Sequence, residues 1–109
     1  KPALIDFTGS DWCGWCIRLK KEVFDTKEFK EWAAKRVVLI EVDFPRGKTQ
    51  SKKTKERNAE LAKQHNVSGY PTIVVVDSEG KAIGRLGYEE GGPKPWIESA
   101  EKVLKAAGL

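Results

Sequence analysis

Residues 12–16 read WCGWC and hold the two cysteines of this 109-residue chain, Cys13 and Cys16. A short apolar run at residues 3–8 (ALIDFT) precedes them and predicts a buried strand. Apolar residues then recur at helical spacing, which predicts a helix over residues 13–24. Cys13 is therefore expected at the point where a strand gives way to a helix.

That position favours ionisation of the Cys13 thiol. Free backbone N–H groups and the helix dipole at a helix start stabilise an anion, and the thiolate is the species that attacks disulfides. Cys16 follows one helical turn later, close enough to bond to Cys13. The expected reaction is attack of Cys13 on a substrate disulfide, after which Cys16 attacks Cys13 and releases the reduced substrate.

Three other interpretations of the cysteine pair fit the sequence less well than the redox one. A structural zinc needs four ligands, whereas the chain offers two cysteines and one histidine, His65, so no metal is expected. Two unrelated buried thiols would leave the flanking Trp12 and Gly14 unexplained, and CxxC in a βαβ context indicates redox chemistry. A bridge that closes four residues constrains the unfolded chain little, so a disulfide scaffold is not expected either.

The rest of the chain alternates between strand and helix patterns. The predicted order is strand, helix, helix, strand, helix, strand, strand, helix. A βα(α)β half followed by a ββα half predicts an α/β fold, with a mixed central sheet and helices on both faces. At this length, residues 1–109 are expected to form a single domain.

Some of these elements carry sharper expectations. Asp25 and Glu28 predict a capping box at the start of the second helix. The β-branched, nearly continuous run at residues 37–43 predicts a strand in the middle of a covered sheet. A helix is expected over residues 54–65, with Ala59, Leu61 and Ala62 as its apolar residues.

Three motifs, in this order, resemble thioredoxin-like proteins: DF at residues 6–7, WCGWC at 12–16 and GYPT at 69–72. The strings FTGSDWC at residues 7–13 and EVDFP at 41–45 resemble more closely the DsbH-type periplasmic disulfide reductases of bacteria. The resemblance extends over nearly the whole chain. It implies a thioredoxin-like fold and thiol-disulfide oxidoreductase activity.

The resemblance also implies roles at the centre of the site. Cys13 would be the exposed nucleophile, and Cys16 the buried thiol that resolves the mixed disulfide. Asp6 would be the buried acid beneath the cysteines that helps Cys16 lose its proton. One extra residue separates Asp6 from Cys13 relative to ordinary thioredoxins, so an ordinary acid at a strand end is the alternative.

Four more residues are expected to contact substrate. The resemblance implies that Pro71 is cis and packs beside the cysteines, and that the Tyr70 backbone pairs with an extended substrate segment. It makes Trp12 an apolar platform at the side of the site. Trp15, between the cysteines, is expected to be exposed, and an exposed large aromatic side chain suggests a contact surface.

The Gly-Trp pair between the cysteines favours reduction of substrates over their oxidation. With no histidine there, one source of thiolate stabilisation is missing, so the pair should be less oxidising than strongly oxidising relatives. The predicted function is reduction of disulfide-bonded protein substrates, with no cofactor and with re-reduction by an unidentified protein electron donor. The alternatives are a disulfide isomerase and a binding module, for partner docking or metal handling, without redox turnover.

Basic residues concentrate in one stretch, residues 46–57, which holds six Lys or Arg against one Glu and so carries +5 while the whole chain carries +4. No aromatic residue is interleaved with them, so a nucleic-acid partner is not expected. A solvated insertion is the ordinary interpretation of such a stretch. Docking to an acidic partner is the sharper one.

Composition also bears on location and assembly. No apolar run approaches the roughly 20 residues of a membrane helix, so membrane insertion is not expected. The chain begins with Lys1 and has no Met, which favours an exported protein, periplasmic or otherwise extracytoplasmic, with the cytoplasm as the alternative. We expect a monomer, because no sequence feature marks a dimer face.

Overall fold

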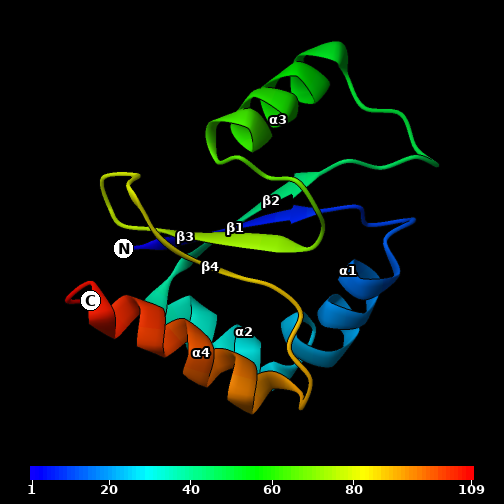
Figure 1. Cartoon of the computed structure of the whole chain (residues 1–109). Coiled ribbons are helices and arrows are strands. Elements are labelled where there is room, and N and C mark those ends of the chain that lie inside the picture. Colours follow the sequence, from blue (N-terminus) through cyan, green and yellow to red (C-terminus); the bar gives the residue numbers. More distant parts are fainter.

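The computed structural model describes all of residues 1–109 and is built on one four-stranded mixed sheet (Figure 1). β1 (Ala3–Thr8) pairs in parallel with β2 (Val38–Asp43) and antiparallel with β3 (Thr72–Val76), which pairs antiparallel with β4 (Ala82–Leu86). The strand order is β2-β1-β3-β4. The predicted mixed sheet and the βα(α)β–ββα order are confirmed.

Helices cover both faces of this sheet (Figure 1). α1 (Gly14–Leu19), the π-helical turn η1 (Lys20–Phe24), α2 (Lys27–Arg36) and α4 (Pro93–Ala106) lie on one face, and α3 (Lys52–Gln64) lies on the other. The helix expected over residues 13–24 is thus found as the α-helix α1 followed directly by the π-helical turn η1. No helix is long and apolar enough to cross a membrane.

Alternation along β1 divides the interior into two cores. Leu4 points into the core under α1, α2 and α4, whose centre is the fully buried Trp96. Ile5 and Phe7 point into the smaller core under α3. Asp6 lies on the same side of β1 as Leu4, so its carboxyl faces the helix that carries the cysteines.

The expected capping box at Asp25 is wrong. Thr26 is the N-cap of α2, and its hydroxyl oxygen accepts the Phe29 N–H at 3.2 Å. Asp25 instead accepts from the Lys20 ammonium at 2.9 Å. Its backbone N–H closes the π-helical turn on the Lys20 carbonyl, so Asp25 still belongs to the preceding helix.

The expected central position of residues 37–43 is also wrong, because β2 is an edge strand. Val38, Leu39 and Ile40 are 48%, 54% and 42% exposed. An unbroken apolar run looks the same in a central strand and in this edge strand, because pairing partners are not encoded locally.

The third helix begins earlier than expected, at Lys52, with Ser51 as its N-cap. Ala59, expected on its apolar face, is exposed, and the neighbouring Asn58 turns inward instead. The Asn58 amide donates to the Asp43 carbonyl at 3.0 Å, at the end of β2. Leu61 and Ala62, the other two expected residues, do pack against the smaller core, so the polar contact of Asn58 acts together with them to orient α3 on the sheet.

The contrast between central β1 and edge β2 predicts unequal effects of two matched substitutions. Leu4→Ala removes a side chain that is 2% exposed and should lower the free energy of unfolding by about 2–5 kcal/mol. Leu39→Ala removes one that is 54% exposed and should lower it by about 0.5 kcal/mol or less. Urea unfolding followed by circular dichroism measures both, and equal losses would contradict the edge position of β2.

Candidate active site

Cys13 and Cys16 form a disulfide at the junction between β1 and α1, with their Cα atoms 5.2 Å apart. Cys13 is the N-cap of α1, and its sulfur accepts the Cys16 N–H at 3.2 Å. The Cys13 N–H donates to the Gly9 carbonyl at 2.9 Å, which closes the turn after the strand. In the reduced protein the Cys16 N–H would face the Cys13 thiolate and stabilise it.

The expected difference in exposure between the cysteines is not found in this disulfide form. Cys13 is 7% exposed and Cys16 is 5% exposed. In this form the Cys13 sulfur lies against the first turn of α1, where it accepts the Cys16 N–H, so the predicted exposed nucleophile is covered. The two cysteines differ in their surroundings instead, because Cys16 alone lines the cavity beneath the bridge.

That cavity, of about 220 Å³, brings Asp6 and Cys16 together. The Asp6 Oδ1 atom is buried and has no hydrogen-bond partner. Burial, followed by the negative charges of Glu41 and Asp43, raises the pKa of Asp6 to about 7. Asp6 can therefore gain or lose a proton near neutral pH beside the buried cysteine.

The GYPT motif lies beside the cysteine turn because β3 pairs with β1. Thr72 is opposite Phe7 in that pairing, so the residues before β3 lie next to the end of β1. The Tyr70–Pro71 peptide bond is cis, the isomer that the resemblance implies. The Tyr70 ring meets the Trp12 ring edge-on, with 5.7 Å between centroids, which joins this segment to the one before Cys13.

Trp12 is held rigidly at the side of the site. Its indole N–H donates to the Phe44 carbonyl at 2.6 Å. Its ring lies so close to Gly9 that a Cβ there would be 2.6 Å from the Trp12 Cζ2 atom, so only glycine fits at position 9. The ring is half-buried and keeps one fixed orientation beside Cys13.

Trp15 is 54% exposed, as expected, and belongs to a cluster that the sequence did not reveal. Its ring packs on Tyr88 at 4.9 Å between centroids, and the Arg18 guanidinium lies 5.3 Å from both rings. Glu22 accepts hydrogen bonds from the Tyr88 hydroxyl and from Arg18, which, in that order, lower the pKa of Glu22. The spacing of Arg18 and Glu22 could have suggested their ion pair, but nothing local points to Tyr88.

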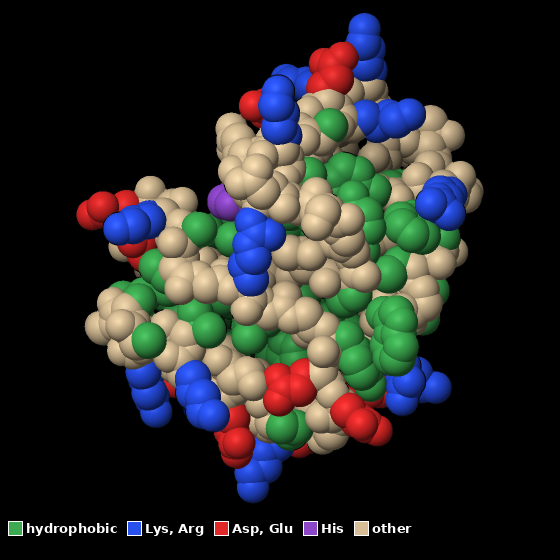
Figure 2. Space-filling model, in the orientation of Figure 1, with side chains coloured by type: hydrophobic (Ala, Val, Ile, Leu, Met, Phe, Trp, Pro, Cys, Tyr) green, Lys and Arg blue, Asp and Glu red, His purple; other side chains and the backbone are tan.

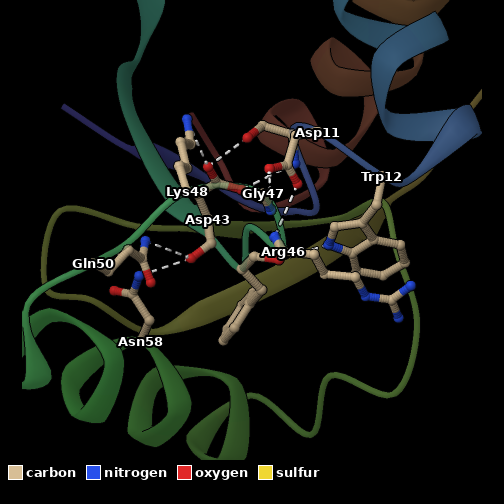
Figure 3. A network of polar contacts seen from close by, with 10 residues as sticks. Asp11, Trp12, Asp43, Arg46, Gly47, Lys48, Gln50 and Asn58 are labelled. Atoms are coloured by element: carbon tan, nitrogen blue, oxygen red, sulfur yellow. Dashed lines mark hydrogen bonds and ion pairs between the residues drawn. The ribbon is translucent and has the colours of Figure 1, made fainter.

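Asp11, which could oppose formation of the Cys13 thiolate if its charge were close, turns toward another segment (Figure 3). Its carboxylate accepts the backbone N–H groups of Arg46 and Gly47 at 2.9 and 2.7 Å. These two bonds, in that order, lower the pKa of Asp11. Asp11 thus anchors the loop after β2 beside the cysteine turn, a role that its sequence context did not indicate.

A metal has no evident set of ligands in the structure. No group of three or more His, Cys, Asp or Glu side chains is placed to hold one. His65, the histidine considered as a zinc ligand, packs its ring against Phe7 at 5.9 Å between centroids.

Comparison with known proteins agrees with the fold and with the cysteine turn. The family model for a thioredoxin-like domain matches residues 1–93. The chain is 39% identical over 105 residues to the disulfide bond reductase DsbH of Chlamydia pneumoniae, covering 96% of this chain and 63% of that protein. It is 29% identical over 86 residues to the thioredoxin-related protein DsbJ of the same organism, covering 79% of this chain and 25% of that protein.

A solved structure of a DsbH oxidoreductase superposes with a TM-score of 0.92 at 39% identity, covering 96% of this chain and 73% of that one. The chain thus spans less than two thirds of the length of either curated relative. The family model covers the sheet strands, the cysteine turn and the Tyr70–Pro71 segment together. On this match the chain belongs to the thioredoxin-like domain family.

Proposed function

We propose that this protein is a thiol-disulfide oxidoreductase that mainly reduces protein disulfides through Cys13 and Cys16. The observation that carries the proposal is the disulfide at the start of α1, where the Cys16 N–H donates to the Cys13 sulfur. A donor in that place favours the attacking thiolate, and the pair can cycle between dithiol and disulfide. The similarity to DsbH, a disulfide bond reductase, supports this direction.

The proposed reaction has two exchange steps. The Cys13 thiolate attacks one sulfur of a substrate disulfide, the substrate S–S bond breaks, and a mixed disulfide forms. Cys16, deprotonated, then attacks the Cys13 sulfur and releases the second substrate thiolate. Two electrons pass to the substrate, and the Cys13–Cys16 disulfide remains to be reduced by a protein electron donor. No cofactor is needed, because the cysteines carry the electrons.

In this scheme Asp6 takes the proton of Cys16. The two side chains line the same cavity, and the pKa of Asp6 is raised to about 7. A base with a pKa near the working pH combines the correct charge state with enough driving force for proton transfer. In this scheme Asp6 acts on Cys16, with which it shares the cavity, and has no role in binding substrate.

Three aromatic residues and Pro71 would form the substrate surface. The Tyr70 backbone, before the cis bond, would pair with an extended substrate segment as a strand does. Trp12 and Trp15 flank Cys13 and Cys16 with one rigid and one more exposed ring. The parts of these rings that Arg46 and Arg18 leave uncovered would give substrate an apolar surface that tolerates variation in its sequence.

We also propose where and in what form the protein works. The DsbH-type proteins that it resembles are periplasmic, and we place this chain outside the cytoplasm on that basis. We expect residues 1–109 to act as one domain and as a monomer.

Two cysteine variants test the redox proposal directly. Cys13→Ser should abolish insulin reduction, because no thiolate remains to begin the exchange. Cys16→Ser should accumulate mixed disulfides with insulin chains, visible on non-reducing gels and by mass spectrometry. If both variants turned over insulin like the unaltered protein, the redox proposal would be wrong and a binding module would replace it.

The reduction potential tests the direction of electron flow. Equilibration with dithiothreitol or glutathione, followed by thiol trapping, should give a value near that of thioredoxin, about −270 mV. A value near about −120 mV, that of a strong oxidant, would make the protein a disulfide donor instead.

Asp6→Asn should change both stability and rate. The folded-state pKa of about 7 exceeds the unfolded value of 3.8, so the folded state holds the extra proton between them and stability falls as pH rises from 4 to 7. Asp6→Asn should remove that fall and be more stable at pH 8, by at most about 4 kcal/mol. Above pH 7 it should also slow the attack of Cys16 on the mixed disulfide, because the base that accepts the Cys16 proton is gone.

Urea unfolding at pH 5 and pH 8, together with single-turnover insulin reduction, measures both effects. Glu60→Gln, which removes an exposed carboxyl on α3, is the matched control and should leave both profiles unchanged. Identical pH dependence of stability in the Asp6→Asn and unaltered proteins would show that Asp6 titrates as an ordinary exposed acid.

A further inference from the structure

Arg46 is an unpaired cation beside the cysteine turn. Its guanidinium carbon lies 3.8 Å from the centroid of the Trp12 ring, and Trp12 immediately precedes Cys13 (Figure 3). The Arg46 side chain is exposed and takes part in none of the ion pairs of the structure. By contrast, Arg18, which lies over Trp15, is already paired with Glu22.

Hydrogen bonds hold the backbone around Arg46, but none of them uses its guanidinium. Asp11 accepts the main-chain N–H groups of Arg46 and Gly47, not the guanidinium. A Cβ at Gly47 would lie 2.9 Å from the Asp11 Oδ2 atom, so the absence of a side chain there allows the close approach. The same loop accepts the Trp12 indole N–H at Phe44.

The acidic groups nearest to this loop are occupied by other partners. Asp11 is satisfied by the two backbone N–H groups, and Asp43 accepts from Ser10 and pairs with Lys48 at 3.5 Å. Arg46 also begins the basic stretch at residues 46–57, which carries +5, and Figure 2 shows Lys and Arg side chains around α3 with a smaller number of Asp and Glu side chains among them. The local field therefore favours a negatively charged partner.

The chemistry of the Arg46 guanidinium limits the kind of partner that it can bind. The guanidinium carbon lies over the Trp12 ring, and the guanidinium N–H donors make no hydrogen bond or ion pair within the chain. A planar fork of this kind binds a carboxylate through two parallel hydrogen bonds, as an ammonium cannot. A substrate segment that crosses Trp12 to reach Cys13 would pass these donors.

We propose that Arg46 determines substrate specificity by pairing with an Asp or Glu carboxylate a few residues from the attacked cysteine of the substrate. The inference rests on the proposed reductase function and adds a substrate class to it. Trp12 supplies the apolar surface, and Arg46, held in place through Asp11 and Gly47, supplies the charge selection.

Two disulfide-linked peptides of equal length test the inference, one with Glu at the positions flanking its cysteine and one with Gln. The unaltered protein should reduce the Glu peptide with kcat/KM about fivefold higher, the upper range for an exposed ion pair. Arg46→Ala should lose this preference while kcat/KM for the Gln peptide stays within about twofold. Arg46→Lys should keep only part of it, because the paired hydrogen bonds are lost.

Two further variants separate this role from a general charge effect. Arg85→Ala removes an exposed arginine on β4 and lowers the net charge by the same amount, and it should keep the full preference. Asp11→Ala frees the loop without changing the charge of Arg46 and should weaken the preference. Thermal unfolding of each variant confirms that the fold is intact.

The outcomes distinguish failure of this inference from failure of the proposed function. Equal kcat/KM for both peptides in the unaltered protein, or a preference that survives Arg46→Ala, would overturn the role of Arg46 while reduction persists. Loss of the preference in Arg85→Ala would assign it to overall charge instead. If neither peptide were reduced, both the proposed reductase function and the inference about Arg46 would be wrong.

Discussion

The pairing of β1 with β2 on one side and β3 on the other brings three distant segments to one edge of the sheet. Thr8 is opposite Asp43, and Phe7 is opposite Thr72. The turn that carries Cys13 therefore begins at the end of β1, with the loop that carries Arg46 one strand spacing away on one side and the cis Tyr70–Pro71 bond one strand spacing away on the other. The disulfide, its flanking rings and the charge beside them all depend on this register, because a slip of one residue would turn Asp6 to the other face.

Burial of Asp6 shows how the same strand serves both folding and chemistry. Leu4, on the same side of β1, fills the larger core, whereas Asp6 opens onto a cavity with a carboxyl oxygen that has no partner. An unpartnered buried polar atom destabilises the fold. The same burial raises the pKa of Asp6 to about 7, which suits the proton transfer that we propose for it.

The two tryptophans of the cysteine turn each lie beneath an arginine, but only one of these arginines has an acidic partner. Each carries an arginine over its ring, Arg46 on Trp12 and Arg18 on Trp15. Glu22 neutralises Arg18 and also accepts from the Tyr88 hydroxyl, so this cluster is closed by its own hydrogen bonds. Arg46 is held through its backbone and has no acidic partner, so its charge is available to a substrate.

Local pattern was sufficient for the elements of the fold and for the reactive pair. The strand at residues 3–8, the cysteine turn after it and the hairpin of β3 and β4 follow from periodicity and turn residues, which act over a few positions of the chain. Only the tertiary structure decided the edge position of β2, the inward turn of Asn58 and the anchoring of the basic loop by Asp11. These depend on which segments meet in space, and hydrogen bonds and ring contacts between residues far apart in the chain leave no periodic signal in it.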